Sequence, residues 1–164
     1  MAFNFPIILL SALVPMIVGA IWYNPKVLGN AWMAAAEMTE DKIKGANMAI
    51  IFGLAYVFAV LIGIEITFVV IHQNHLDSMF FDALQNHDPE ITDLVNKVRE
   101  LSKHNHRTFG HGAFHGGIAG VLFALPVLGT NALFERKGFK YIAINGLYWI
   151  VSLALMGGVI CQLS

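Results

Sequence analysis

The sequence predicts an all-α, polytopic membrane protein with four transmembrane helices in an antiparallel bundle, and two observations lead to this. Of the 164 residues, 57% are hydrophobic and only 13% are charged, a balance too apolar for an ordinary soluble domain. Four apolar stretches also reach the roughly 20 residues that a helix needs to cross a bilayer core. They run about 5–23, 48–71, 109–128 and 139–163, so residues 1–164 are expected to form a single membrane domain.

The first predicted span carries no charged residue. Pro6 lies where a helix tolerates proline, whereas Pro15 falls inside the span and is expected to kink it. Trp22 and Tyr23 close the span with amphipathic rings that favour the headgroup level. A cleavable signal peptide has a basic start and a shorter apolar core, so we expect this helix to remain on the protein.

The second predicted span is interrupted only by Glu65, and Thr39 followed by Glu40 and Asp41 indicates a helix start upstream of it. The third and fourth spans are joined by a short polar segment, 131–138. A connection this short predicts that the two helices are antiparallel neighbours.

The long loop, 72–108, is the one sizeable extramembrane segment in the sequence. Asp88 and Pro89 predict the capped start of an amphipathic helix. Its apolar residues fall on one face: Ile91, Leu94, Val95, Val98 and Leu101. The stripe can lie on the bilayer surface or cap the bundle, and the mixture of acids and bases around it favours capping.

The distribution of basic residues predicts the orientation in the membrane. Six lie on the side of Trp22: Lys26, Lys42, Lys44, Arg136, Lys137 and Lys140. Four lie in the long loop: Lys97, Arg99, Lys103 and Arg107. Because cytoplasmic loops carry the excess of basic residues, we expect the Trp22 side to face the cytoplasm, with both termini and the long loop on the outer side.

Charge and motifs exclude several classes of function. The formal net charge is −1, with no basic stripe, so no nucleic-acid partner is expected. The lone Cys161 excludes a disulfide framework and CxxC redox chemistry. The sequence contains no GxSxG elbow, phosphate-binding loop, GxGxxG fingerprint or paired acid motif, so we expect no enzyme activity.

Two stripes of small residues recur at a spacing of four. One is Gly112, Gly116 and Gly120, and the other is Ala55, Ala59 and Gly63. In lipid, helices associate largely through close backbone approach and van der Waals contact, which small residues permit. The two stripes can pack against each other within the chain, or one can face a second protein, and the first alternative is favoured.

Histidines gather at both ends of the long loop. The chain has seven, and His111 and His115 are four residues apart, a spacing that places two imidazoles on one helix face. His72 and His75, three apart, are candidates for the same role. The cluster is a candidate site for a divalent metal ion or haem. A set of interfacial histidines bonded to backbone or water is favoured over such a site, because HxxxH lacks the further residues of a specific motif.

Glu65 is the one acidic residue well inside a predicted span, which makes it a functional candidate. Its depth matches that of His115, so the two can form a proton relay, a metal site with His111, or a neutral structural pair. Its direction opposes the pairing, because at 100° per residue Glu65 points away from the Ala55, Ala59 and Gly63 stripe. A protonated Glu65 hydrogen-bonded inside the bundle is therefore the favoured interpretation.

Polar residues are also expected to gather at the opposite membrane face, near Trp22 and Tyr23. They are Asn24, Asn131, Glu135 and Arg136, with Asn145 and Tyr148 along the fourth span. A salt-bridged helix cap is one interpretation. A pocket for a lipid headgroup or small ligand is the other.

Several segments resemble an uncharacterised bacterial membrane family, domain of unknown function 1761. They are 19–25 with 29–32, 130–137, and 144–149 with 156–158, while 109–116 resembles its Bacteroidetes-type members. The signature positions are Trp22, Tyr23, Asn24, Pro25, Trp32, Asn131, Glu135, Arg136, Asn145, Tyr148 and Trp149. The resemblance implies a small four-helix protein of the bacterial inner membrane, so the termini and the long loop are expected on the periplasmic side. It brings no known activity, cofactor or catalytic residue. The middle of the long loop falls outside it.

Three functions compete on this basis. The favoured one is an accessory or oligomerising subunit whose partners are the lipid bilayer and either further copies of the chain or other membrane proteins. The second is metal-ion or proton handling, as a transporter or sensor, through Glu65, His72, His75, His111 and His115. The third is lipid or small-ligand binding at the face of Trp22, Asn131 and Arg136.

Overall fold

The computed structural model describes residues 4–164, and in this range the secondary structure is helical, with no strand. Four helical segments are long and apolar enough to cross a membrane: Phe5–Trp22, Met48–Val70, Phe109–Phe134 and Phe139–Leu163. The predicted all-α class with four spans is therefore confirmed. The third span continues beyond the predicted end at residue 128, because polar residues lower its hydropathy without ending the helix.

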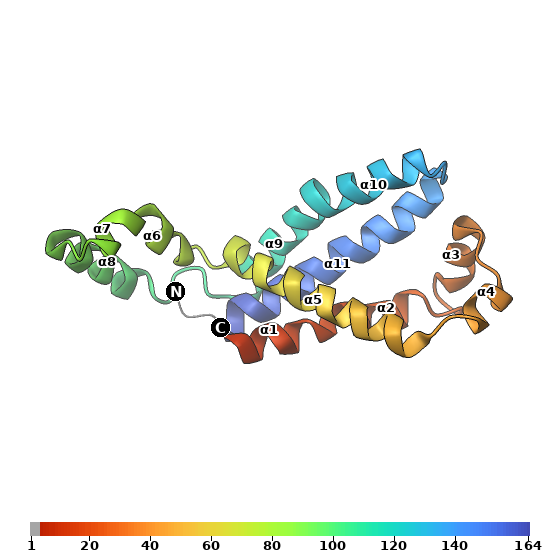
Figure 1. Cartoon of the computed structure of the whole chain (residues 1–164), viewed down its shortest axis with the longest axis horizontal. Coiled ribbons are helices and arrows are strands. Elements are labelled where there is room, and N and C mark those ends of the chain that lie inside the picture. The colour runs from red at the N-terminus through yellow and green to blue at the C-terminus, as the bar shows by residue number, and fades with distance from the viewer. Residues whose placement is uncertain (1–3) are drawn as a thin grey trace.

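The first span is two helices, α1 (Phe5–Ser11) and α2 (Leu13–Trp22), separated at Ala12 (Figure 1). Pro15 has no N–H with which to bond the carbonyl of Ser11, four residues earlier, so the backbone ladder is interrupted there. Just before the break, the Ser11 hydroxyl donates to the Ile8 carbonyl at 2.8 Å. The kink expected from Pro15 therefore lies on the N-terminal side of the proline.

Two short helices, α3 (Gly29–Ala36) and α4 (Glu40–Lys44), connect the first span to the second, α5 (Met48–Val70). Thr39 caps α4, its hydroxyl accepting from the Lys42 N–H at 3.3 Å. α5 has its own cap, because the Asn47 side chain accepts from the Ile50 N–H at 3.2 Å. The start predicted at Thr39 is thus real, but it belongs to a separate helix.

The third span is α9 (Phe109–Ala119), a π-helical segment η1 (Gly120–Ala124) and α10 (Leu125–Phe134). The π segment immediately precedes the turn that contains Pro126, where a hydrogen-bond donor is missing. Figure 1 shows α10 and α5 diverging toward the end of the bundle where α3 and α4 lie. The third span therefore packs against different neighbours along its length.

The last helix, α11 (Phe139–Leu163), is the centre of the bundle. In its most apolar stretch 56% of the residues are buried, against at most 22% in the other spans. It contacts helices of all three other spans. Leu153, Met156 and Ile160 pack with Ala59 and Ile66 in the core.

The glycine stripe of α9 lies against α11. A Cβ added to Gly116 would overlap the Leu153 carbonyl, with its carbon 2.8 Å away, and one added to Gly112 would come within 2.8 Å of the Gly157 carbonyl carbon. The stripe thus allows the backbones of α9 and α11 to approach closely.

The stripe of α5 faces α1 instead. A Cβ on Gly63 would lie 3.2 Å from Ile8 Cγ2 and 3.4 Å from Ser11 Oγ. Ala59, one turn earlier, is buried. The expectation that the two stripes pack against each other is wrong, because each meets a different helix of the same chain.

The long loop folds into an arm of three helices: α6 (Asn74–Met79), α7 (Phe81–Gln85) and α8 (Pro89–Ser102). The predicted cap of α8 is confirmed, since the Asp88 carboxylate accepts from the Ile91 N–H at 3.2 Å. Figure 1 shows the arm extending beyond the end of the bundle, and α8 packs mainly on α6 and α7. The helix therefore does not cap the bundle.

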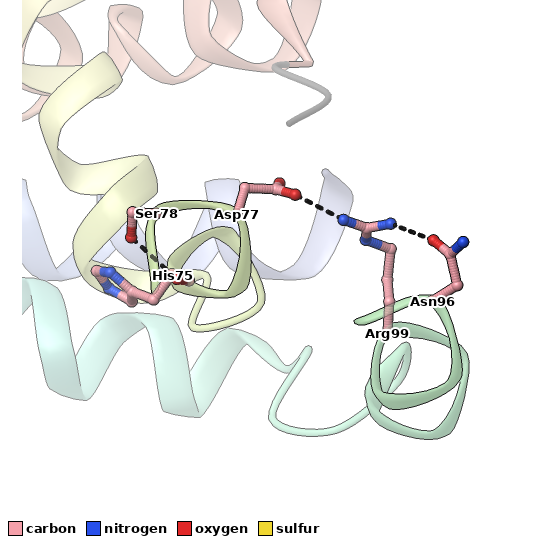
Figure 2. Close-up of polar contacts among 5 residues, drawn as sticks. All are labelled: His75, Asp77, Ser78, Asn96 and Arg99. Carbon is pink, nitrogen blue, oxygen red and sulfur yellow. Dashed lines mark hydrogen bonds and ion pairs between the residues drawn. The ribbon is translucent and has the colours of Figure 1, made fainter. Parts of the chain in front are cut away.

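One ion pair holds α8 to α6, as Figure 2 shows. Arg99 Nη2 lies 2.6 Å from Asp77 Oδ1, and Arg99 Nη1 donates to Asn96 Oδ1 at 3.0 Å. In the stripe of α8, Val95 is buried while Leu101 is 74% exposed. The short helices α6 and α7 cover only part of this apolar face, and that is why the arm keeps exposed hydrophobic residues.

Candidate metal centre

Three histidines meet where α5 ends and α9 begins. His72 follows the last residues of α5, and His111 and His115 lie on the first two turns of α9. Thr108 caps α9, with its hydroxyl accepting from the His111 N–H at 3.3 Å. This cap fixes the start of α9 and hence the direction of the two histidines.

The three imidazoles are close enough to share one ion. One ring nitrogen from each lies within 4.8 Å of the other two. The Nε2 atoms of His72 and His111 are 3.0 Å apart. The ring centroids lie 5.0 Å apart for His72 and His111, 4.9 Å for His72 and His115, and 4.4 Å for His111 and His115.

The short distance between His72 and His111 requires one nitrogen to donate and the other to accept, so at least one of these rings is neutral. Partial burial lowers the pKa of His72, and the neighbouring His115 lowers it further. Both causes favour the neutral imidazole, which is the form that binds metal ions.

His106 is a fourth histidine beside this group, and the sequence patterns did not single it out as a ligand. Its ring stacks on His111 at 4.8 Å and lies 6.4 Å from His72. The Cys161 thiol donates to the His106 carbonyl at 3.2 Å. No helical spacing relates residue 106 to residue 111, because the start of α9 lies between them, so only the fold reveals this neighbour.

Hydrogen bonds tie the segment before α9 to the ends of two spans. The Gln73 side-chain amide donates to the carbonyls of Ser102 and Asn105, at 2.8 and 3.0 Å. The Arg107 guanidinium donates to the carbonyl of Ser164 at the end of α11. The three histidines therefore lie where hydrogen bonds connect the arm to the bundle.

His75, a predicted ligand, lies outside this group. The prediction assumed that His72 and His75 share a helix face, but α5 ends at Val70 and α6 begins at Asn74. The chain changes direction between the two residues, so the spacing of three carries no helical meaning here. His75 is on the arm, where its carbonyl accepts from the Ser78 hydroxyl at 2.9 Å (Figure 2).

Glu65 does not join the histidines either. Its carboxyl group lines a cavity between α5, α10 and α11 and is exposed. Within residues 4–164 no hydrogen bond or ion pair reaches that carboxyl group. Since Gly63 faces α1, Glu65 turns toward α10, whereas His115 turns toward His72. The structure forms neither the Glu65–His115 pair nor a buried, hydrogen-bonded Glu65.

Toward the opposite membrane face, signature residues hydrogen-bond the first span to α11. Trp22 Nε1 donates to the Ile144 carbonyl at 3.1 Å, and the Tyr148 hydroxyl donates to the Pro15 carbonyl at 3.0 Å. The Tyr23 hydroxyl donates to the Asn145 side chain at 2.8 Å. Burial raises the pKa of Tyr23, so its hydroxyl remains a donor.

Three further signature positions, Asn24, Pro25 and Trp32, lie in or beside the connection from the first span to α3. The Tyr23 ring contacts Trp32, with centroids 5.4 Å apart. Asn24 accepts from the Lys26 N–H at 2.9 Å, and the Pro25 carbonyl accepts from the Asn30 side chain at 3.1 Å. These residues therefore order the turn after the first span.

The predicted salt-bridged cap has different members. Lys137, rather than Arg136, pairs with an acid, Glu37 on the first connection, at 3.2 Å. Arg136 is exposed with a left-handed φ of 57°. Asn131 and Glu135 line the same cavity as Glu65. Some polar groups of this face thus hydrogen-bond the first span to α11, and others line the cavity. They do not form one pocket with Trp22.

Comparisons with known proteins place the whole bundle in one family. No curated protein and no solved structure matches the chain. A family model described as "Protein of unknown function (DUF1761)" matches residues 7–161, which include the three histidines, Glu65 and the signature positions. The chain therefore belongs to the DUF1761 family.

Proposed function

We propose that the protein binds a divalent transition-metal ion of the zinc class at the membrane surface, through His72, His111 and His115. The observation that carries this is the convergence of three ring nitrogens within 4.8 Å. Zinc–nitrogen bonds of about 2.0–2.1 Å in tetrahedral geometry place two ligand nitrogens about 3.3 Å apart. The distance of 3.0 Å between His72 and His111 is close to this separation.

The donor set selects the class of ligand. Imidazole nitrogens suit zinc, copper and nickel, whereas magnesium and calcium prefer oxygen. The His72 and His111 nitrogens lie too close together for a porphyrin ring between them, so an ion is favoured over haem. Three protein ligands leave a fourth position for water or an incoming donor. This arrangement supports metal sensing or delivery more than a closed structural site.

The proposal includes the orientation of the site. In a bacterial cytoplasmic membrane, the excess of basic residues on the Trp22 side supports an orientation with the arm and the three histidines facing the periplasm. The metal centre would then meet ions from outside the cell.

Zinc titration of the purified protein in detergent, against a competing chromogenic chelator, tests the metal centre. His115→Ala is expected to lower zinc affinity by about 100-fold or more, because even outer-shell substitutions cost 10–100-fold. His75→Ala is the matched control, since that residue lies nearby in the sequence but outside the group.

The wild type and His75→Ala are expected to bind one zinc ion per chain with the same affinity. Equal zinc affinity in the wild type and His115→Ala would show that the three histidines do not form the site.

As a second candidate function, we propose that the protein is an accessory subunit that binds further copies of itself or another membrane protein through the arm. The arm extends beyond the spans, yet Met79 is 72% and Leu101 is 74% exposed. Exposed apolar side chains on a segment outside the spans favour an interaction surface. The glycines of α9 do not supply that surface, because α11 covers them.

Co-purification from native membranes tests this second candidate. Leu101→Glu is expected to release the partner, because it places a charge in the apolar surface. Lys97→Glu, on the same helix, is expected to retain it. A wild-type chain that elutes without other proteins and as a monomer in native mass spectrometry would exclude the accessory role.

A further inference from the structure

A second candidate site lies within the membrane-spanning part of the bundle. Its cavity has a volume of about 720 Å³ and lies between α5, the third span and α11. This volume is within the roughly 300–1,000 Å³ of small-molecule sites. Residues from Ile62 to Val69 form one wall and residues from Ala119 to Ala132 form the other, with Trp149 and Leu153 from α11. The histidines of the metal centre do not line it.

The cavity exists because the third span diverges from α5. Phe123 and Ala124 of the π segment η1 line the cavity, and Pro126 follows them at the start of α10. Figure 1 shows the resulting separation between α5 and α10. Lining residues of both helices are exposed, among them Glu65 on α5 and Val127 on α10, so a molecule dissolved in the bilayer can reach the cavity.

The lining is apolar apart from a few groups, and these are acidic or neutral. Glu65 lies toward the arm end, and Glu135 lies at the opposite end with Asn131 and Tyr141. Among the described residues that line the cavity there is no lysine, arginine or histidine. Phe123 and Trp149 add aromatic rings, which attract cations through their π faces. The charge of this cavity therefore complements a cation.

The exposed carboxyl group of Glu65 needs a partner that residues 4–164 do not supply. An acidic group facing hydrocarbon is costly, and such residues are normally paired. A phospholipid does not meet this need, because its phosphate would be repelled by Glu65 and Glu135. A second copy does not meet it either, since the four spans contain one lysine and no arginine, Lys140 at the far end of α11, and their two histidines are gathered with His72 in the metal centre.

We propose that this cavity binds a lipophilic organic cation, an ammonium or phosphonium with aromatic or alkyl substituents. Glu65 is its counterion, and Phe123 and Trp149 contact its apolar groups. The bilayer delivers the ligand, because the cavity opens between α5 and α10. This site is independent of the proposed metal centre and uses none of its ligands.

Two probes of nearly equal shape and opposite charge test the proposal: tetraphenylphosphonium and tetraphenylborate. Equilibrium dialysis is carried out with the full chain in phosphatidylcholine nanodiscs, and binding to empty nanodiscs is subtracted. The wild type is expected to bind the cation and not the anion. Glu65→Gln is expected to weaken cation binding about tenfold or more, since it removes a charge-assisted interaction.

Three variants complete the experiment. Glu100→Gln removes an exposed acid of the arm and His115→Ala removes a histidine of the metal centre, and both are expected to leave cation binding unchanged. Leu128→Trp fills the cavity without changing its charge and is expected to abolish binding. It provides a second test should Glu65→Gln fail to fold.

Several results would overturn the proposal. Equal binding of the two probes would show an apolar cavity without charge selection, and unchanged cation binding in both Glu65→Gln and Leu128→Trp would place the cation elsewhere. Disulfide-linked dimers of Val127→Cys, made in a Cys161→Ala background, together with no cation binding, would show that a second copy covers the cavity.

Discussion

Replacing Gly116 with leucine is expected to lower the free energy of unfolding by on the order of 4 kcal/mol or more. A Cβ at this position already comes within 2.8 Å of the Leu153 carbonyl carbon, and backbone cannot move aside as a side chain can. The α9 and α11 helices would have to separate along the closest contact in the bundle. Thermal unfolding of the purified protein in detergent measures the loss.

Gly110→Leu is the matched control for this substitution. Gly110 lies on the same helix, but a Cβ there meets nothing within 4 Å. Its replacement is expected to leave stability unchanged or to raise it slightly, because leucine favours the helix more than glycine does. Similar unfolding temperatures for the two variants would contradict the close contact between α9 and α11. Loss of a partner in Gly116→Leu would report a damaged fold, not a lost interface.

Zinc is expected to stabilise the fold by about 4 kcal/mol at a free concentration 1,000 times its dissociation constant. The ion would join the end of α5 to the start of α9, two segments that the chain connects only through the whole arm. Chelation, or simultaneous replacement of His72, His111 and His115 by alanine, is expected to remove this stabilisation. Unfolding curves with zinc, with magnesium and with chelator measure it, and magnesium is expected to have no effect.

Acidification is expected to lower the free energy of unfolding, both by protonating His72 and by displacing zinc. The folded protein holds the pKa of His72 below its ordinary value of 6.5, so the unfolded chain binds a proton there more readily. The contribution of neutral His72 is then complete above pH 6.5 and is lost as the pH falls through the lowered value. Protons and zinc also compete for the same nitrogens. A zinc effect that is unchanged well below pH 6 would contradict ligation by these imidazoles.

Features that depend on a few neighbouring residues were predictable from the sequence. Four spans follow from hydropathy, because a long apolar segment can cross a bilayer as a helix that satisfies its own backbone hydrogen bonds. The start of α8 follows from Asp88 and Pro89, since a cap is a local hydrogen bond. Two members of the candidate site, His111 and His115, follow from a spacing of four within one continuous helix.

Features that depend on how helices face each other required the tertiary structure. His72 joins His111 while His75 does not, because α5 ends between Val70 and His72 and the chain turns. Glu65 faces a cavity, because Gly63 rests on α1 and fixes the rotation of α5. Hydropathy and spacing describe each helix alone, whereas rotation and contact depend on residues far apart in the chain. For this reason the sequence by itself determined the spans, and packing determined which side chains meet.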